Sequence, residues 1–217
     1  MTPSTPSVDR SLPSQADGAR RTTGRLFIIS APSGAGKSTL FRAVRQRLPD
    51  LRYSVSHTTR RPRGEEKNGV DYHFVTQAAF RKDINADKWA EWAEVHGNYY
   101  GTSAEFIDRA LGEGCDVLLD IDVQGMEQIL KRYPDSVTIF IMPPSLAVLR
   151  QRLQDRGTDS AASISERLDN AAAEIRRRKR YCYIVVNDRL EEAIDELTAI
   201  ITAGRSSAAG GNLDRSK

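Results

Sequence analysis

The sequence predicts an α/β fold in which helices flank a parallel sheet. Short apolar runs of strand length alternate with segments of helical length along most of the chain, and this alternation is typical of a parallel sheet. The first apolar run leads through a loop of small residues directly into a helix, an arrangement that binds phosphate in many α/β proteins. A chain of 217 residues is long enough for one large domain with inserted parts.

The first unit of the fold joins a predicted strand, Arg25–Ser30, to a predicted helix, Lys37–Leu48, which ends before Pro49. The loop between them matches the pattern G-x-x-x-x-G-K-[ST], except that Ala31 takes the place of the first glycine. Such a loop directs backbone N–H groups at phosphate oxygens, and the helix N-terminus adds partial positive charge. A Gly/Ser loop that matches by chance is the weaker interpretation, so we expect a nucleoside triphosphate here. The residues expected to contact it are Ser33, Gly34, Ala35, Gly36, Lys37, Ser38 and Thr39.

The region from residue 53 to residue 102 interrupts the regular alternation. The elements expected there are short strands at Tyr53–Ser56 and Asp71–Phe74, a helix at Gln77–Asn85, and an apolar and acidic segment at Trp89–Val95. A Gly97-Asn98 turn follows them. We interpret this region as a substrate-binding insertion.

Regular alternation resumes after the insertion, where each strand is a short apolar run and each helix shows helical periodicity. The elements expected are helix Ser103–Leu111, strand Cys115–Asp122, helix Gly125–Arg132, strand Val137–Met142, helix Ser145–Arg156, helix Ser163–Arg180, strand Tyr183–Val186 and helix Glu191–Thr202. Residues 156–180 carry many charges, and we expect them to form a helical flap over the site.

Composition excludes several other classes of protein. No apolar run approaches the length that spans a membrane, and a net charge of +3 is too small to indicate a nucleic-acid partner by itself. The two cysteines are expected to be reduced thiols in a cytoplasmic protein, because too few further ligands lie near them for a metal site. Residues 1–24 and 205–217 are polar and rich in small residues, and both are expected to be disordered.

A cluster of arginines follows the first insertion strand. Arg60, Arg61 and Arg63 lie in a turn that contains Pro62, and a planar guanidinium suits phosphate oxygens better than an ammonium does. Tyr72 offers a hydroxyl donor nearby in the sequence. Alone, the cluster fits a solvated basic loop better than a phosphate site, and its neighbours in the sequence reverse that preference.

Three carboxylates complete the candidate chemistry. Asp120 and Asp122 end an apolar strand two residues apart, at the edge of a parallel sheet where ligands bind. We expect Asp120 and the Ser38 hydroxyl to lie near Mg²⁺, Asp120 through water, and Asp122 to face an acceptor nucleotide. Either aspartate alone fits equally well as a cap of the following helix. Glu91 lies between two tryptophans and is able to accept hydrogen bonds from the N–H groups of guanine, although alone it fits a surface carboxylate.

Together these motifs resemble the guanylate kinase family. The resemblance runs from about Gly24 to Gly204 and is carried by four stretches of the sequence. They are Ser30-Ala-Pro-Ser-Gly-Ala-Gly-Lys-Ser-Thr39, Ser54-Val-Ser-His-Thr-Thr-Arg60, Gly97-Asn-Tyr-Tyr-Gly101 and Leu119-Asp-Ile-Asp122.

The resemblance implies roles for individual residues. It implies that Ser56, Glu91 and Asp122 bind the guanine base, that Arg60, Arg63, Tyr72 and Tyr100 hold the GMP phosphate, and that Glu66 and Thr102 lie near this nucleotide. It implies that Arg156 and Arg167 close over the transferring phosphate beside Lys37, and that Asn187 lies near the adenine of ATP.

The implied fold is that of a P-loop nucleoside monophosphate kinase, with an inserted mixed α/β GMP-binding subdomain and a helical lid. The expected domain is 25–204, with a core of residues 25–52, 103–155 and 181–204, a GMP-binding insertion at 53–102 and a lid at 156–180. The implied reaction moves the γ-phosphoryl group of ATP, bound with Mg²⁺, to GMP or dGMP, with no nucleic acid or membrane as partner.

Two positions depart from the family pattern, and two other functions stay open. The run Arg176–Arg180 is more basic than expected, and Cys182 stands where an aspartate is expected. Neither position carries the transfer chemistry. The alternatives are an inactive guanylate-kinase-like binding module and a P-loop kinase for another phosphorylated small molecule.

Overall fold

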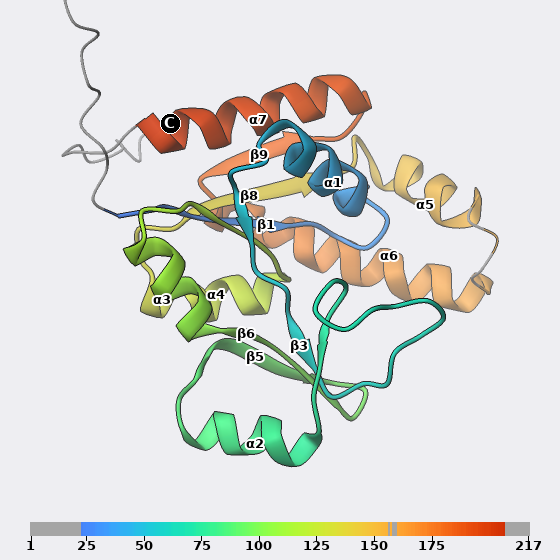
Figure 1. Cartoon of the computed structure of the whole chain (residues 1–217). Coiled ribbons are helices and arrows are strands. Elements are labelled where there is room, and N and C mark those ends of the chain that lie inside the picture. The colour runs from blue at the N-terminus through green and yellow to red at the C-terminus, as the bar shows by residue number, and fades with distance from the viewer. Residues whose placement is uncertain (1–22, 156, 158–159, 207–217) are drawn as a thin grey trace, which may run out of the picture.

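The computed structural model describes residues 23–155, 157 and 160–206. At its centre lies a five-stranded parallel sheet with the strand order β2-β7-β1-β8-β9 (Figure 1). The strands are β1 (Leu26–Ser30), β2 (Arg52–Tyr53), β7 (Val117–Asp120), β8 (Val137–Met142) and β9 (Tyr183–Val186). The predicted α/β class and the parallel sheet are confirmed.

Helices cover both faces of this main sheet, as Figure 1 shows. Successive residues of β1 point to opposite faces, so Phe27 packs in one apolar core and Ile28 in the other. The first core includes residues of two helices, α1 (Lys37–Arg47) and α7 (Leu190–Ser206). The second includes residues of α3 (Ala104–Gly112) and α4 (Val123–Arg132). This two-sided burial explains why β1 is apolar throughout.

A second, smaller sheet projects from the main one together with one helix (Figure 1). Its strand order is β4-β3-β6-β5, and only β3 and β4 are parallel. The elements are β3 (His57–Thr58), β4 (His73–Phe74), α2 (Gln77–Asn85), β5 (Trp89–Val95) and β6 (Asn98–Ser103). Their own core is aromatic, with the Phe80 ring stacked on Trp89 at 4.2 Å and on Tyr99 at 5.3 Å between ring centroids.

Two helices after β8 pack on each other and are followed by a 3-10 turn. They are α5 (Leu146–Asp155), α6 (Ala161–Arg176) and η1 (Arg177–Arg180). Leu149 and Leu153 of α5 bury their side chains against Ile164 and Leu168 of α6. Within the described residues, no helix combines the length and the apolar character needed to cross a membrane.

The structure differs from the sequence-based expectations at several element ends. The predicted strand Tyr53–Ser56 is wrong as a single element, because Tyr53 pairs with Leu118 in the main sheet whereas His57 pairs with Gly101 in the second. The predicted strand Cys115–Asp122 is shorter, since Asp122 already caps α4. The predicted helix Ser163–Arg180 begins earlier, after the Ser160 cap, and tightens into η1 at its end.

A buried ion pair joins the start of β7 to α7. The Asp116 carboxylate accepts a hydrogen bond from the Arg25 backbone N–H at 2.7 Å and lies 3.0 Å from Arg205 Nε. The Asp116 side chain is 7% exposed, whereas Asp50, a second partner of Arg205, is 69% exposed. A buried charge depends on its partner far more than an exposed one does.

We expect Asp116→Ala to lower the free energy of unfolding by about 2–3 kcal/mol, because it removes the buried carboxylate that pairs with Arg205 and accepts from the Arg25 N–H. Denaturant unfolding of the full chain measures this change. Asp50→Ala is the matched control and is expected to lower the free energy by less than about 1 kcal/mol. Equal losses in the two variants would contradict a stabilising role of the buried pair.

Candidate functional site

The phosphate loop joins β1 to α1 and has a conformation that glycine makes possible. Gly34 and Gly36 have φ angles of 90° and 91°, in the left-handed region that favours glycine. Gly36 is the N-cap of α1 and makes no side-chain cap. The N–H groups of Lys37 and Ser38, in the first turn, therefore have no acceptor within the helix and remain suited to an anion.

A buried asparagine outside the loop fixes its backbone by a hydrogen bond. Asn187 is 5% exposed, and its Nδ2 donates to the Ala35 carbonyl at 2.7 Å. A β-carbon at Gly36 would collide with the same Nδ2 atom, so both the φ angle and this contact require glycine there. The Ala35 N–H donates to the Pro32 carbonyl at 3.1 Å. The polar backbone atoms of Ala35 are thus used within the protein.

The base of the α5–α6 pair packs against the loop. A β-carbon at Gly34 would lie 2.9 Å from Leu149 Cδ1 and 3.0 Å from Leu153 Cδ2. The Arg152 guanidinium donates to the Asn187 carbonyl at 2.9 Å, and its Nη1 is buried with no hydrogen-bond partner among the residues that the structure describes. Arg152 therefore brings an unsatisfied cationic donor close to the support of the loop.

The carboxyl end of β7 brings the predicted aspartates to the loop. Asp120 forms an ion pair with Lys37, and both side chains are about three-quarters buried. Asp122 caps α4, because its Oδ1 accepts from the Gly125 N–H at 2.7 Å. The capping alternative therefore applies to Asp122, which has one carboxylate oxygen left for a ligand.

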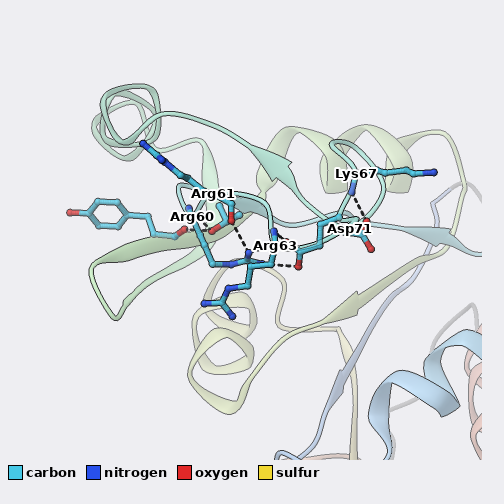
Figure 2. A network of polar contacts seen from close by, with 8 residues as sticks. Arg60, Arg61, Arg63, Lys67 and Asp71 are labelled. Atoms are coloured by element: carbon cyan, nitrogen blue, oxygen red, sulfur yellow. Dashed lines mark hydrogen bonds and ion pairs between the residues drawn. The ribbon is translucent and has the colours of Figure 1, made fainter. Parts of the chain in front are cut away.

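Arg60 belongs to an ordered network that includes backbone atoms of Arg61 and Arg63, as Figure 2 shows, whereas the Arg61 and Arg63 side chains are exposed. Arg60 donates to both oxygens of Glu66, with Nη1 and Nη2 each at 2.9 Å, and its side chain is 10% exposed. Glu66 also accepts from the Arg63 N–H at 2.8 Å. The hydrogen bonds from Arg60 and from the Arg63 backbone lower the pKa of Glu66 to about 2.

Two tyrosines flank this network. The Arg60 guanidinium lies over the Tyr72 ring at 5.3 Å from the centroid, within the range of a cation–π contact. The Tyr72 and Tyr100 rings meet edge to face at 6.1 Å. The hydrogen bonds to Glu66 raise the pKa of Arg60, so the guanidinium stays charged. Arg60, Tyr72 and Tyr100 are therefore gathered in one place, as expected for phosphate binding.

Glu91 lies in a buried acidic pocket. It is 8% exposed and accepts a hydrogen bond from Thr102 Oγ1 at 2.6 Å. The pKa of Glu91 is raised to about 7, mainly because the carboxyl group is buried. The hydrogen bond from Thr102 lowers the pKa, and the negative charge of Asp122 raises it. A β-carbon at Gly125 would lie 3.0 Å from Glu91 Oε2, so this glycine lets the carboxylate approach the N-terminus of α4.

The remaining predicted residues lie on three different elements. Ser56 directly precedes β3, and its carbonyl accepts from the His73 N–H at 2.9 Å. Arg63 is exposed beside the network, and Arg167 lies on α6. Arg156 lies outside the described residues.

Sequence reasoning missed two residues of this region, Arg152 and Glu174. Glu174 of α6 is half-buried, and burial together with the negative charge of Asp122 raises its pKa while Lys37 opposes the shift. The end of α6 therefore reaches the edge of the sheet where Lys37 and Asp122 lie. The sequence signal for Arg152 is its spacing of one helical turn before Arg156. For Glu174, an acid two residues before a basic run gives only a weak signal.

Comparisons with known proteins agree with this geometry. The sequence profile of the guanylate kinase family matches residues 23–204. Guanylate kinase from Geobacter metallireducens is 50% identical over 182 residues, which cover 84% of this chain and 90% of that protein. Guanylate kinase from Shewanella violacea is 50% identical over 188 residues, covering 86% and 91%.

A solved structure supports the same assignment. The crystal structure of guanylate kinase from Anaplasma phagocytophilum superposes with a TM-score of 0.69 at 33% identity, and the match covers 87% of this chain and 89% of that one. The predicted P-loop nucleoside monophosphate kinase fold is thereby confirmed. The chain belongs to the guanylate kinase family, the phosphotransferases that form ADP and GDP from ATP and GMP.

Proposed function

We propose that this chain transfers the γ-phosphoryl group of ATP to GMP or dGMP, and that two groups of side chains hold the two nucleotides. The observation that carries the proposal is the meeting of both groups at the carboxyl end of β7. Asp120, the last residue of that strand, pairs with Lys37, and the α4 N-terminus two residues later lies against Glu91. This edge of a parallel sheet is where ligands bind in such folds.

The phosphate loop is the proposed ATP site. The N–H groups of Ser33, Gly34, Gly36, Lys37, Ser38 and Thr39 line the loop and the first turn of α1. Lys37 would exchange Asp120 for the β- and γ-phosphates, one anion for another. Asn187 supports the loop from below and is expected near the adenine. Ala35 supplies the carbonyl that Asn187 binds.

Family members use ATP, generally with a divalent metal, and we propose Mg²⁺ for this chain. The Ser38 hydroxyl is exposed at the start of α1, and the carboxylate of Asp120 lies beside Lys37. Such oxygen donors suit Mg²⁺, which Asp120 would hold through water. When bound, the metal supplies neutralisation of charge on the phosphate oxygens.

The second sheet is the proposed GMP-binding subdomain. Arg60 and Arg63 would hold the acceptor phosphate, with hydroxyl donors from Tyr72 and Tyr100 and with Glu66 fixing the plane of the Arg60 guanidinium. The Glu91 carboxylate would accept from guanine N1–H and N2–H, beside Thr102, Ser56 and the second oxygen of Asp122.

The proposed lid is the segment 156–180, whose main helix is α6, and α5 lies at its base. Arg167, together with Arg156, would neutralise the transferring group, and Arg152 would join them, because its buried Nη1 has no hydrogen-bond partner within the described part of the chain. Closure of the lid excludes water, which would otherwise accept the phosphoryl group. Transfer itself needs alignment and charge neutralisation, and the acceptor phosphate is already ionised near neutral pH, so no strong general base is required.

A cytoplasmic location stays a prediction. The free cysteines, Cys115 and Cys182, fit a reducing compartment.

A nucleotide panel tests the proposed substrate. The chain is expected to form GDP and dGDP from GMP and dGMP, with AMP, CMP and UMP as poor acceptors, because only guanine matches the acceptors around Glu91. Glu91→Gln is expected to lower kcat/KM for GMP by at least about 100-fold and to leave the KM for ATP unchanged. Equal rates with AMP would exclude the guanine assignment, and a folded chain without turnover would favour the inactive binding module.

The raised pKa of Glu91 predicts a pH dependence of GMP binding. Guanine donors need the ionised carboxylate, so GMP affinity is expected to rise as pH increases through about 7 and to level off above it. The KM for GMP, measured from about pH 6 to pH 8.5, reports this change. GMP phosphate also gains charge there, so Glu91→Gln serves as the reference. If both proteins gave the same profile, Glu91 would not be the titrating group.

Lys37→Met tests the proposed charge neutralisation at the transferring group. We expect kcat to fall by about 10²–10³-fold while the chain still folds, because a positioned donor to the transition state is lost. Lys131→Met, which changes an exposed lysine of α4, is the matched control and is expected to keep kcat. Thermal unfolding of both variants separates loss of catalysis from loss of structure. A Lys37→Met enzyme with full kcat would overturn the role.

A further inference from the structure

A cavity lies between the second sheet and α3. It has a volume of about 400 Å³, and its lining includes His57 of β3, His73 of β4 and three residues of α3, Glu105, Phe106 and Arg109. This volume falls within the range of about 300–1,000 Å³ that is usual for small-molecule sites. No part of the proposed mechanism uses the cavity.

The cavity and the proposed GMP site use different residues of the segment that leads into β3. Val55 and His57 line the cavity, while Ser56 lies between them in the chain. None of the residues proposed to bind GMP is among the lining residues of the cavity. A ligand in the cavity would therefore be separate from GMP.

The walls of the cavity are largely aromatic. Within it, the His57 and His73 rings stack with centroids 4.5 Å apart and an angle of 28° between their planes. Tyr53 and Phe106 contribute two further rings from the core side. Aromatic walls of this kind favour a planar ring as ligand.

Three polar groups of the lining have no partner among the residues that the structure describes. His57 Nδ1 is buried without a hydrogen bond. Arg109 and Glu105, exposed on α3, form no ion pair in this part of the chain. Burial keeps the pKa of His57 near 4, so its ring is neutral and offers one donor and one acceptor. A guanidinium, a carboxylate and a neutral imidazole together match a ligand that carries an acid group and ring N–H groups.

We propose that this cavity binds a small planar nitrogen heterocycle with an acidic substituent, held by Arg109 at its anionic end and by His57 at its ring edge. Aromatic stacking with the histidine pair supplies the apolar part of the contact. The Glu105 carboxylate accepts from a ring N–H and disfavours ligands with a second acid group.

Such a ligand would act on the junction between the two sheets. The chain leaves the main sheet after Tyr53 and enters the second sheet at His57, then returns through Ser103 into α3. Tyr53, His57 and Ser103 all line the cavity, so an occupant touches both crossings. It stabilises the present orientation of the second sheet and resists the movement that brings GMP toward ATP. We therefore expect it to raise the KM for GMP.

Benzimidazole-5-carboxylate is the probe, and benzimidazole is its counterpart without the acid. Titration calorimetry of the full chain with each probe measures binding. Arg109→Met is expected to lower the affinity for the carboxylate probe by about tenfold and to change the affinity for benzimidazole by less than about twofold. His57→Phe, which keeps an aromatic ring but removes both ring nitrogens, is expected to lower the affinity for both probes. Arg42→Met, an exposed arginine of α1 outside the cavity, is the matched control and is expected to change neither.

The proposed GMP site also presents arginines and a carboxylate, so it must be distinguished from the cavity. The carboxylate probe is expected to bind in the presence of saturating GMP with its dependence on Arg109 unchanged, and to raise the KM for GMP but not that for ATP. Displacement by GMP with no effect of Arg109→Met would place the probe in the GMP site and overturn the proposal. Absence of binding at millimolar probe would overturn it equally. The calorimetric result does not depend on GMP kinase activity, so failure of the proposed function would be recognised separately.

Discussion

The contact between Asn187 and the phosphate loop is the constraint on which the proposed ATP site depends. Gly36 has the left-handed conformation that starts α1, and its missing side chain leaves the space that Asn187 Nδ2 fills on its way to the Ala35 carbonyl. Asn187 directly follows β9, the edge strand beside β8, and its own carbonyl accepts from Arg152 of α5. The loop, the edge of the sheet and the base of the lid are therefore one connected unit. A change at any of the three is transmitted to the N–H groups that face phosphate.

Each of the main proposed phosphate-binding cations is already paired with a carboxylate. Lys37 pairs with Asp120, and Arg60 makes a bidentate contact with Glu66. A largely buried cation without a partner is costly, so these carboxylates keep the charges in place within the pockets. An incoming phosphate then replaces a carboxylate as the partner of a cation that is already ordered. Less conformational entropy is therefore lost on binding than if a free side chain had to be ordered. Glu66 also holds the Arg60 guanidinium over Tyr72, which fixes the plane in which a phosphate is met.

Sequence reasoning was most successful where the signal is local. The apolar runs and the phosphate loop predicted the main sheet and its first helix, because burial and turn geometry are set by neighbouring residues. It was wrong about the strand at Tyr53–Ser56, because Tyr53 ends a strand of the main sheet and the pairing in the second sheet starts only at His57, each with partners far away in the chain. The sequence also did not predict the contact of Asn187 with the phosphate loop or the unsatisfied Nη1 of Arg152, because both depend on contacts between residues far apart in the chain. Glu91 was recognised as a candidate, but its raised pKa follows from burial and from Asp122, which only the fold brings near it.

The carboxyl end of β7 supplies a fixed reference for both proposed nucleotide sites. The strand lies between β1 and β2 in the main sheet, so its position does not depend on the second sheet. Its last residue, Asp120, holds Lys37, while Asp122 fixes the start of α4, against which Glu91 packs. Glu91 belongs to the second sheet, so the carboxylate proposed to bind the base lies against a helix terminus of the core. A guanine held there is positioned relative to β7, and β7 is positioned relative to Lys37. Alignment of acceptor and donor phosphates thus follows from one short strand and the helix that it leads into.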